Sequence, residues 1–297
     1  MNPTSTGSVI ADFGGSVLAA ALPILLSALG GLFTESAGSL SVALEGAMLA
    51  GAFSAVAVAV ATGSTILALG AAVFAGLFVG ALLGQVATRL KADVFVAGLA
   101  VNLLVPAMAT MLSGSLFGTQ GVVNLPEGVA GRALSSDNSI AVVLAIACVG
   151  LWIAHELSPL GIRLRAAGER GEAARAAGLD RDGLGRLSHL VAGAAAGLSG
   201  AWLALSVAAF VPGMSAGRGW IALVAIYLGG RRPIGILAAS LGFGALLSLS
   251  NRAQSIALLP PELLPALPYL VTFAAYLLSQ RKKTKAALVG KEKPRSE

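Results

Sequence analysis

Apolar runs follow one another along almost the whole chain, separated by short polar turns. A helix that crosses a bilayer needs about 20 mostly apolar residues, because the hydrocarbon core is about 30 Å thick. The pattern therefore predicts an all-α polytopic transmembrane helical bundle with about nine spans, within a range of eight to ten. We place them at residues 8–33, 41–61, 64–88, 93–112, 139–157, 187–211, 220–228, 234–250 and 262–279.

The seventh segment, 220–228, is apolar but too short to cross the core as a straight helix. We expect a broken or re-entrant helix there, since irregular backbone is tolerated at membrane depth only where protein or a cavity surrounds it. We keep this segment as a crossing. Without it, Arg231 and Arg232 would lie on the side opposite the other basic residues.

The distribution of basic residues predicts the orientation. Loops rich in Lys and Arg stay in the cytoplasm, so the most basic loop, 158–186, is expected inside. Nine spans then place 17 of the 20 Lys and Arg residues inside, with only Arg132, Arg218 and Arg252 outside. The N-terminus is expected outside and the C-terminus in the cytoplasm. The transmembrane domain is expected to cover residues 1–280, and a basic cytoplasmic tail 281–297.

Composition agrees with a membrane protein and narrows the possible partners. Only 11% of the residues are charged and 56% are hydrophobic, whereas a soluble domain carries about 25% charged residues. The pI near 9.9 could suggest nucleic acid. The basic residues, however, lie between spans and in the tail, which is typical of membrane topology and contact with anionic lipid. No removable signal peptide is expected before the first run.

The segment 160–182 is the one long polar interruption in the middle of the chain. Six arginines lie between Arg163 and Arg186, interleaved with acidic residues. Residues 169–177 are expected to form a short helix that Gly178 stops. Such a helix suits docking into a groove on a partner protein. The alternative is a solvated loop that only fixes topology, and composition favours neither.

The sequence lacks the residue patterns that several kinds of enzyme and metal site require. There is no GxxxxGK[ST] motif, so the chain should not hydrolyse ATP through a P-loop of its own. His155 and His189 have no carboxylate or nucleophile that we can place beside them, and the single cysteine, Cys148, excludes an internal disulfide. We expect no catalytic residues, metal or cofactor. Few ionisable residues lie inside spans, so coupling energy should enter from outside, at the 160–182 loop.

Four stretches, in order, resemble permeases of ABC importers in the branch for simple sugars, nucleosides and branched-chain amino acids. GIRLRAAGERGEAARAAGLD (161–180) is similar to the family's cytoplasmic coupling loop. The other three are ALPILLSALGGLFTESAGSLSVALEGAMLAGAF (21–53), VFVAGLAVNLLVPAMATMLSGSLFG (94–118) and SAGRGWIALVAIYLGGRRPIGILAASLGFG (215–244). The nucleoside and simple-sugar subgroup is the most similar. Ser41 and Ala43 depart from the usual Asn and Gly, and Arg231-Arg232 from a Trp-Asn type pair.

The resemblance implies a division of labour. Two permease subunits, identical or paralogous, form the path across a prokaryotic inner membrane. A separate P-loop ATPase docks from the cytoplasm, and an extracytoplasmic binding protein delivers the substrate. The permease then switches between outward- and inward-facing states as the ATPase moves the coupling helix. A nucleoside or simple sugar is the expected solute, with riboflavin or another vitamin as an alternative.

Candidate residues fall into two sets. The substrate path is expected to involve Glu45, Ser41, Asn102, Arg218 and Trp220. ATPase coupling is expected to involve Arg163, Arg165, Gly168, Glu169, Ala173, Ala174 and Gly178. Glu45 has an alternative role in capping backbone groups or pairing with a neighbouring chain, Asn102 in an interhelical hydrogen bond, and Arg218 and Trp220 in interface anchoring.

Other functions remain open at this level. An ion- or proton-coupled carrier would need an essential intramembrane acid, and a scaffolding membrane protein would have no substrate.

Gly76, Gly80 and Gly84 recur every four residues and predict a close contact between two helices.

Overall fold

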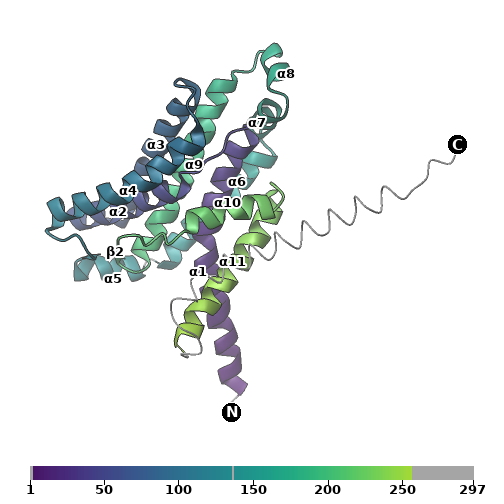
Figure 1. The fold of residues 1–297 in the computed structure, drawn as a ribbon. Helices are drawn as coiled ribbons and strands as arrows, with labels where there is room; N and C mark the ends of the chain where they lie inside the picture. Colours follow the sequence, from purple (N-terminus) through teal and green to yellow (C-terminus); the bar gives the residue numbers. More distant parts are fainter. Residues whose placement is uncertain (1–2, 136, 256–297) are drawn as a thin grey trace. The chain divides into compact units, whose positions relative to one another are not determined.

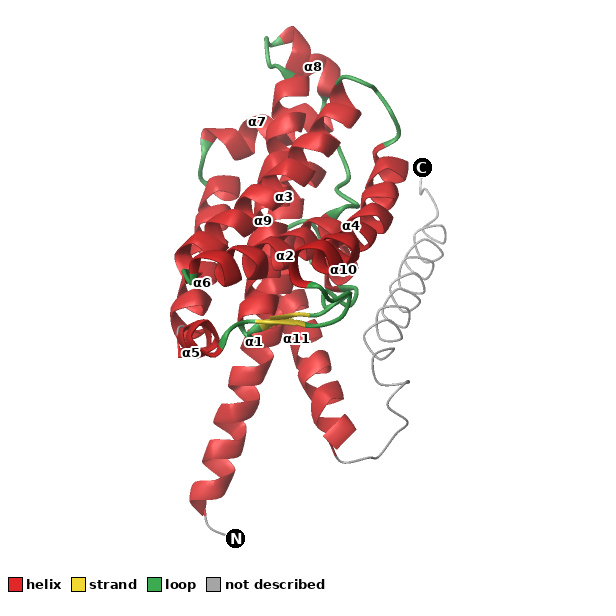
Figure 2. Cartoon of the chain, turned by 90° about the vertical axis from the view of Figure 1, so that its left-hand side faces the viewer, coloured by secondary structure: helices red, strands yellow, loops and turns green. Residues whose placement is uncertain are grey.

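The computed structural model describes residues 3–135 and 137–255, which form helices with two short strands (Figures 1 and 2). The chain divides into two compact units, one made of residues 18–244 and one that includes residues 3–17 and 245–255. We describe each by itself. The expected ninth span, 262–279, and the basic tail, 281–297, lie outside the described residues.

Seven of the described helices are long and apolar enough to cross a membrane, which confirms a polytopic helical bundle. The helices that carry these spans are α1 (Pro3–Ser36), α2 (Leu44–Thr62), α3 (Thr65–Thr88), α4 (Val94–Phe117), α6 (Asp137–Glu156), α9 (Arg181–Leu205) and α11 (Pro233–Ser255). The short apolar segment forms α10 (Arg218–Leu228), an 11-residue helix. At about 1.5 Å per residue, α10 spans about half of the hydrocarbon core.

Close backbone contacts at glycine positions hold α2, α3 and α9 together in the larger unit. A Cβ atom on Gly76 would lie 2.1 Å from the Gly193 carbonyl oxygen, and one on Gly80 would lie 2.2 Å from the His189 carbonyl oxygen. On α2, a Cβ on Gly51 would lie 2.2 Å from the Gly197 carbonyl oxygen. The prediction that the 76-80-84 repeat packs a helix is thus confirmed. The backbones approach this closely only because these positions carry no side chain.

The first helix, α1, also packs against α9. The Ser27 hydroxyl donates to the Ser199 hydroxyl at 2.9 Å, and both side chains are fully buried. Nearer the N-terminus, the Trp202 indole donates to the Ala19 carbonyl at 3.1 Å. These bonds satisfy polar groups that would otherwise lie unpaired among apolar side chains.

Two sequence expectations about boundaries were wrong. The sixth span was expected at 187–211, but α9 begins at Arg181, where the Asp180 side chain caps it, and ends at Leu205. Beyond it, strand β2 (Ala209–Phe210) pairs antiparallel with β1 (Val123–Asn124). The stretch between the expected spans 93–112 and 139–157, expected as one of the polar turns, contains β1 and helix α5 (Glu127–Ser135). Backbone pairing across the chain thus ends the span earlier than hydropathy indicates.

The arginine-rich segment also differs from the expected single helix over 169–177. It forms α7 (Pro159–Glu169) and α8 (Gly171–Ala176), separated at Arg170. The Ser158 side chain accepts a hydrogen bond at the start of α7, and Pro159 is its first residue. Serine followed by proline is a favoured helix start. Gly178 follows α8 with a φ of +81°, in line with the expected stop.

In the smaller unit, the described residues come from the beginning of α1 and the end of α11. The Arg252 guanidinium lies 5.1 Å from the centroid of the Phe13 ring, within the range of a cation–π contact.

Candidate functional site

The N-termini of α2 and α10 meet at Glu45. This residue lies in the first turn of α2, and its two carboxylate oxygens accept hydrogen bonds from the backbone N–H groups of Gly217 (2.9 Å) and Gly219 (2.7 Å) at the start of α10. The first N–H groups of a helix have no partner within it, and they favour a negative charge. A Cβ on Gly219 would lie 2.4 Å from the Glu45 nitrogen. The half-buried Glu45 is therefore a cap for α10 supplied by another helix.

Asn102 fixes the start of α2 in a similar way. Its Oδ1 accepts from the Gly46 N–H at 2.8 Å, and its Nδ2 donates to the Val42 carbonyl at 2.9 Å. Asn102 is the ninth residue of α4, so it lies about 12 Å along that helix. Only a side chain that both donates and accepts can satisfy both backbone groups. The interhelical hydrogen-bonding role considered for Asn102 is present.

The remaining path candidates lie next to these two helix starts. Ser41 is buried in the segment that leads into α2. Arg218 is the first residue of α10, and its guanidinium donates to the Met214 carbonyl at 2.9 Å. Trp220 follows two residues later and is half-buried. The structure thus brings all five candidates to the start of either α2 or α10.

The segment 37–43, here called the connector, joins the end of α1 to α2 and is largely non-helical. Val42 and Ala43 are buried, and a Cβ on Gly98 of α4 would lie 2.7 Å from the Val42 side chain. Irregular backbone next to apolar spans is stable only where its polar groups find partners within the protein. Asn102 supplies that partner for Val42.

Both histidines bind serines, one at the end of α1 and one in the connector. His155 Nε2 lies 2.8 Å from the Ser36 hydroxyl, and His189 Nε2 lies 3.0 Å from the Ser39 hydroxyl. These two contacts could not be predicted from the sequence, because nothing distinguishes a serine that binds a distant histidine from any other serine in a polar turn. The histidines come from α6 and α9. They therefore anchor the end of α1 and the connector to two other helices.

The coupling candidates divide into an exposed and a buried set. Arg163, Glu169, Ala173 and Gly178 are exposed. Arg165 is half-buried and donates to the His155 carbonyl at 2.9 Å, and Ala174 is buried. The fully buried Leu164 packs with Phe33 and Ala37. Helix α7 is thus attached to the bundle by one face, and its other face is exposed.

Gly168 joins α7 to the connector. A Cβ on Gly168 would lie 2.2 Å from the Ser36 carbonyl oxygen, and one on Gly38 would lie 3.1 Å from the Gly168 Cα. Gly38 has a φ of +75°, a conformation that favours glycine. The two backbones are therefore in direct contact, with no side chain between them.

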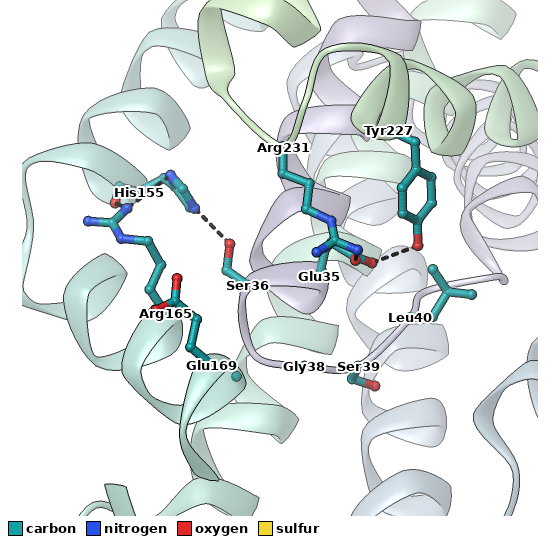
Figure 3. A pocket seen from close by; sticks show the side chains of 11 residues that line it. Glu35, Ser36, Gly38, Ser39, Leu40, His155, Arg165, Glu169, Tyr227 and Arg231 are labelled. Carbon is teal, nitrogen blue, oxygen red and sulfur yellow. Dashed lines mark hydrogen bonds and ion pairs between the residues drawn. The ribbon is translucent and has the colours of Figure 1, made fainter. Parts of the chain in front are cut away.

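A polar cavity of about 490 Å³ lies beside this contact (Figure 3). On one wall, Arg231 Nη2 forms an ion pair with Glu35 Oε1 at 2.6 Å, and the Tyr227 hydroxyl donates to Glu35 Oε2 at 2.9 Å. His155 and Arg165 form another part of the lining. Sequence reasoning missed Glu35 and Tyr227; the only available signal was an acidic residue directly after the first apolar run.

The described residues also bear on metal binding. Within 3–135 and 137–255, no group of three or more His, Cys, Asp or Glu side chains is arranged to hold a metal ion.

Comparison with known proteins decides the family. Residues 15–276 match the profile of the family described as "Branched-chain amino acid transport system / permease component". The chain belongs to this permease family. The permease is 30% identical over 284 residues to the guanosine ABC transporter permease protein NupQ of Bacillus subtilis, covering 88% of this chain and 89% of the relative.

Two further relatives are similar over most of their length. The permease is 30% identical over 302 residues to the nucleoside ABC transporter permease protein NupC of Lactococcus lactis subsp. cremoris, covering 94% of each chain. It is 29% identical over 290 residues to the putative glucose ABC transporter permease protein TsgC13 of Haloferax volcanii, covering 86% of this chain and 87% of the relative. No solved structure matches the chain. The resemblance found in the sequence is confirmed, and the permease is an integral protein of the prokaryotic inner membrane.

Proposed function

We propose that this permease forms the path for a nucleoside or simple sugar in an ATP-driven importer and couples to a separate ATPase through residues 160–182. The observation that carries the coupling is the backbone contact between Gly168 of α7 and the connector. The connector leads directly into α2, whose first turn holds Glu45. A displacement of α7 would therefore act directly on the connector and, through it, on the start of α2.

Helix α10 supports the same route. Glu35, at the end of α1, binds Tyr227 and Arg231 at the C-terminal end of α10, while Glu45 binds Gly219 at its N-terminal end. Two acids on either side of the connector thus hold both ends of one short helix. Motion of the connector would shift α10 as a body. A switch of this kind needs an element with two arrangements that a partner can bias.

The relatives support the solute class. Their names specify guanosine, nucleoside and glucose transport. We propose that Glu45, Ser41, Asn102, Arg218 and Trp220 border the path. The two helix starts place backbone dipoles toward one region, as discontinuous transporter helices do at their substrate sites. In this arrangement Glu45 and Asn102 act chiefly by holding the helix starts in place.

The family supports the choice of partners, and the basic residues support the orientation. We propose a P-loop ATPase, a second permease subunit and an extracytoplasmic substrate-binding protein as the other components. We also propose that the face with α7 is cytoplasmic, that the N-terminus is outside and that about nine spans cross the membrane. Arg231, in the turn after α10, and Arg165, on α7, line one cavity, so these two basic segments share a face, as the positive-inside rule expects.

Charge reversal on the exposed side of α7 tests the coupling. Arg163→Glu should lower ATP-driven nucleoside uptake in vesicles at least about fivefold, the lower end of typical coupling effects. The protein level and the melting temperature should stay unchanged, because the Arg163 side chain is exposed. Arg89→Glu, an exposed arginine at the end of α3, is the matched control.

The same assay separates this function from its alternatives. Normal uptake by Arg163→Glu, with ATPase still bound in stoichiometric amount, would reject coupling through this face. Uptake without any ATPase would instead favour an ion-coupled carrier. Co-purification of a P-loop ATPase and a second permease with the native protein would support the importer directly.

A further inference from the structure

A second, larger cavity of about 840 Å³ lies beside the polar cavity, and His155, Arg165 and Arg231 line both. Its lining comes from the end of α6, from α7, from the turn between α10 and α11 and from the first residues of α11. Three arginines and one acid face it: Arg165, Arg231, Arg232 and Glu156. The candidate path and the coupling contact leave this cavity without a role.

The positive charge of this cavity is only partly compensated. Arg231 pairs with Glu35 and Glu156 bonds to His155. Within residues 3–135 and 137–255, neither Arg165 nor Arg232 forms an ion pair with an acidic side chain. The Arg165 guanidinium is nevertheless held in position by the His155 carbonyl at 2.9 Å. A cavity with two such guanidinium groups favours an anion, and the planar fork of arginine matches phosphate oxygens.

The surroundings of the cavity indicate where such an anion would come from. Ile234 is part of the lining and 68% exposed, and Leu228, just before the turn, is 56% exposed. Trp152, one turn before His155, also lines the cavity and is half-buried. Tryptophan is enriched where a span meets the lipid headgroups. Basic cavities between helices on the cytoplasmic side of a membrane are typical sites for anionic headgroups.

We propose that this cavity binds the phosphate group of an anionic phospholipid, with Arg165 and Arg232 as its principal ligands. The phosphate would lie among the guanidinium groups, and the acyl chains would extend along the exposed apolar side chains of Ile234 and Leu228. A free phosphate ion shares the same chemistry with the arginines but gains nothing from the apolar residues. This site is separate from the proposed solute path and does not depend on which solute is carried.

Binding can be measured on the full-length chain purified in detergent. Three probes are added at equal ionic strength: dioctanoyl phosphatidylglycerol, the zwitterionic dioctanoyl phosphatidylcholine, and inorganic phosphate. Native mass spectrometry counts bound lipid, and thermal unfolding measures the stabilisation. We expect phosphatidylglycerol to bind more tightly than phosphatidylcholine and to raise the melting temperature.

The arginine variants locate the site. Arg232→Gln should weaken phosphatidylglycerol binding about fivefold, which corresponds to about 1 kcal/mol per basic residue near an anionic lipid. The Arg232 side chain is exposed, so this variant should fold normally. Arg165→Gln should weaken binding as well. Arg175→Gln is the matched control, because Arg175 is exposed on α8 and does not line the cavity.

The outcomes are distinct. Weakening by Arg232→Gln but not by Arg175→Gln supports the lipid site. Stabilisation by inorganic phosphate that equals the lipid effect, and that Arg232→Gln also removes, identifies the same site as one for free phosphate. Equal binding of the two lipids, or phosphatidylglycerol binding that neither Arg232→Gln nor Arg165→Gln alters, would overturn the proposal.

Discussion

Glu45 Oε2 accepts a hydrogen bond of 2.7 Å from the backbone N–H of Gly219, so a side chain of α2 caps α10. The other carboxylate oxygen binds Gly217. One acid therefore joins two helix starts that are far apart in the sequence. The absence of a side chain at Gly219 is what permits this approach.

Removal of this cap should lower the stability of the folded protein measurably. Glu45→Ala leaves two helix N–H groups without their acceptor, and loss of a helix cap typically costs about 0.5–2 kcal/mol. Glu45→Gln keeps one oxygen acceptor but turns an NH2 group toward an N–H donor, so we expect an intermediate loss. Thermal unfolding in detergent checks both variants. Glu127→Ala, an exposed acid in the first turn of α5, is the control.

Transport distinguishes two roles for Glu45. If the acid only holds α10, uptake by Glu45→Gln should fall in proportion to the loss of folded protein. A loss of uptake in protein that is fully folded would instead assign Glu45 a direct role in the path.

A second prediction concerns Asn102, which binds the start of α2. Asn102→Ala leaves the Gly46 N–H and the Val42 carbonyl unpaired, and each buried unsatisfied group costs about 1–3 kcal/mol. Asn102→Asp keeps the acceptor but loses the donor to Val42, so it should also be destabilising. Melting temperature is the measurement. Asn124→Ala, an exposed asparagine on β1, should change it little.

Glu45 and Asn102 should also be coupled, because Asn102 fixes Gly46, the residue next to Glu45, and thereby the position from which Glu45 caps α10. We expect the double variant Glu45→Ala/Asn102→Ala to lose less stability than the sum of the single losses. Strict additivity would mean that the two bonds act on independent structures.

The packing of α3 on α9 can be tested with two glycines of the same helix. Gly76→Ala places a Cβ 2.1 Å from the Gly193 carbonyl oxygen, so the helices must separate. Overpacking of this kind typically costs about 1–3 kcal/mol. A Cβ on Gly70 meets nothing within 4 Å. Gly70→Ala should therefore be neutral or slightly stabilising, since alanine is the better helix former.

Expression level and melting temperature report this difference. Equal behaviour of the two variants would show that α3 does not depend on close contact with α9.

The sequence could predict those parts of the structure that local patterns determine, but not those that contacts between distant residues determine. The apolar runs and the four-residue glycine repeat are local patterns, and they predict most helices and the close face of α3. The shortened end of α9 was missed because a two-residue strand pairing, Val123 with Phe210, decides it. Hydropathy contains no information about such a distant backbone contact.

The site was predicted in part for the same reason. Polar residues inside spans are rare enough to single out Glu45 and Asn102, although their partners are backbone groups that no motif marks. Glu35 and Arg231 are paired only in three dimensions. Residues 41–43 of the connector were expected in the second span, and the contact between Gly38 and Gly168 has no signal in the sequence because it involves no side chain.

Gly168 provides the most direct test of the connector's role in coupling. Gly168→Ala would place a Cβ 2.2 Å from the Ser36 carbonyl oxygen, so α7 must move away from the connector. Because Leu164 and Arg165 still attach α7 to the bundle, the fold should survive with a loss of about 1–3 kcal/mol, as for other overpacked sites. ATP-driven uptake should fall at least about fivefold. Gly150→Ala, where a Cβ meets nothing within 4 Å, is the control. ATPase that remains bound, with hydrolysis no longer matched by uptake, is the signature of a broken link at the connector. Unchanged uptake in folded Gly168→Ala protein would show that the signal from α7 takes another route.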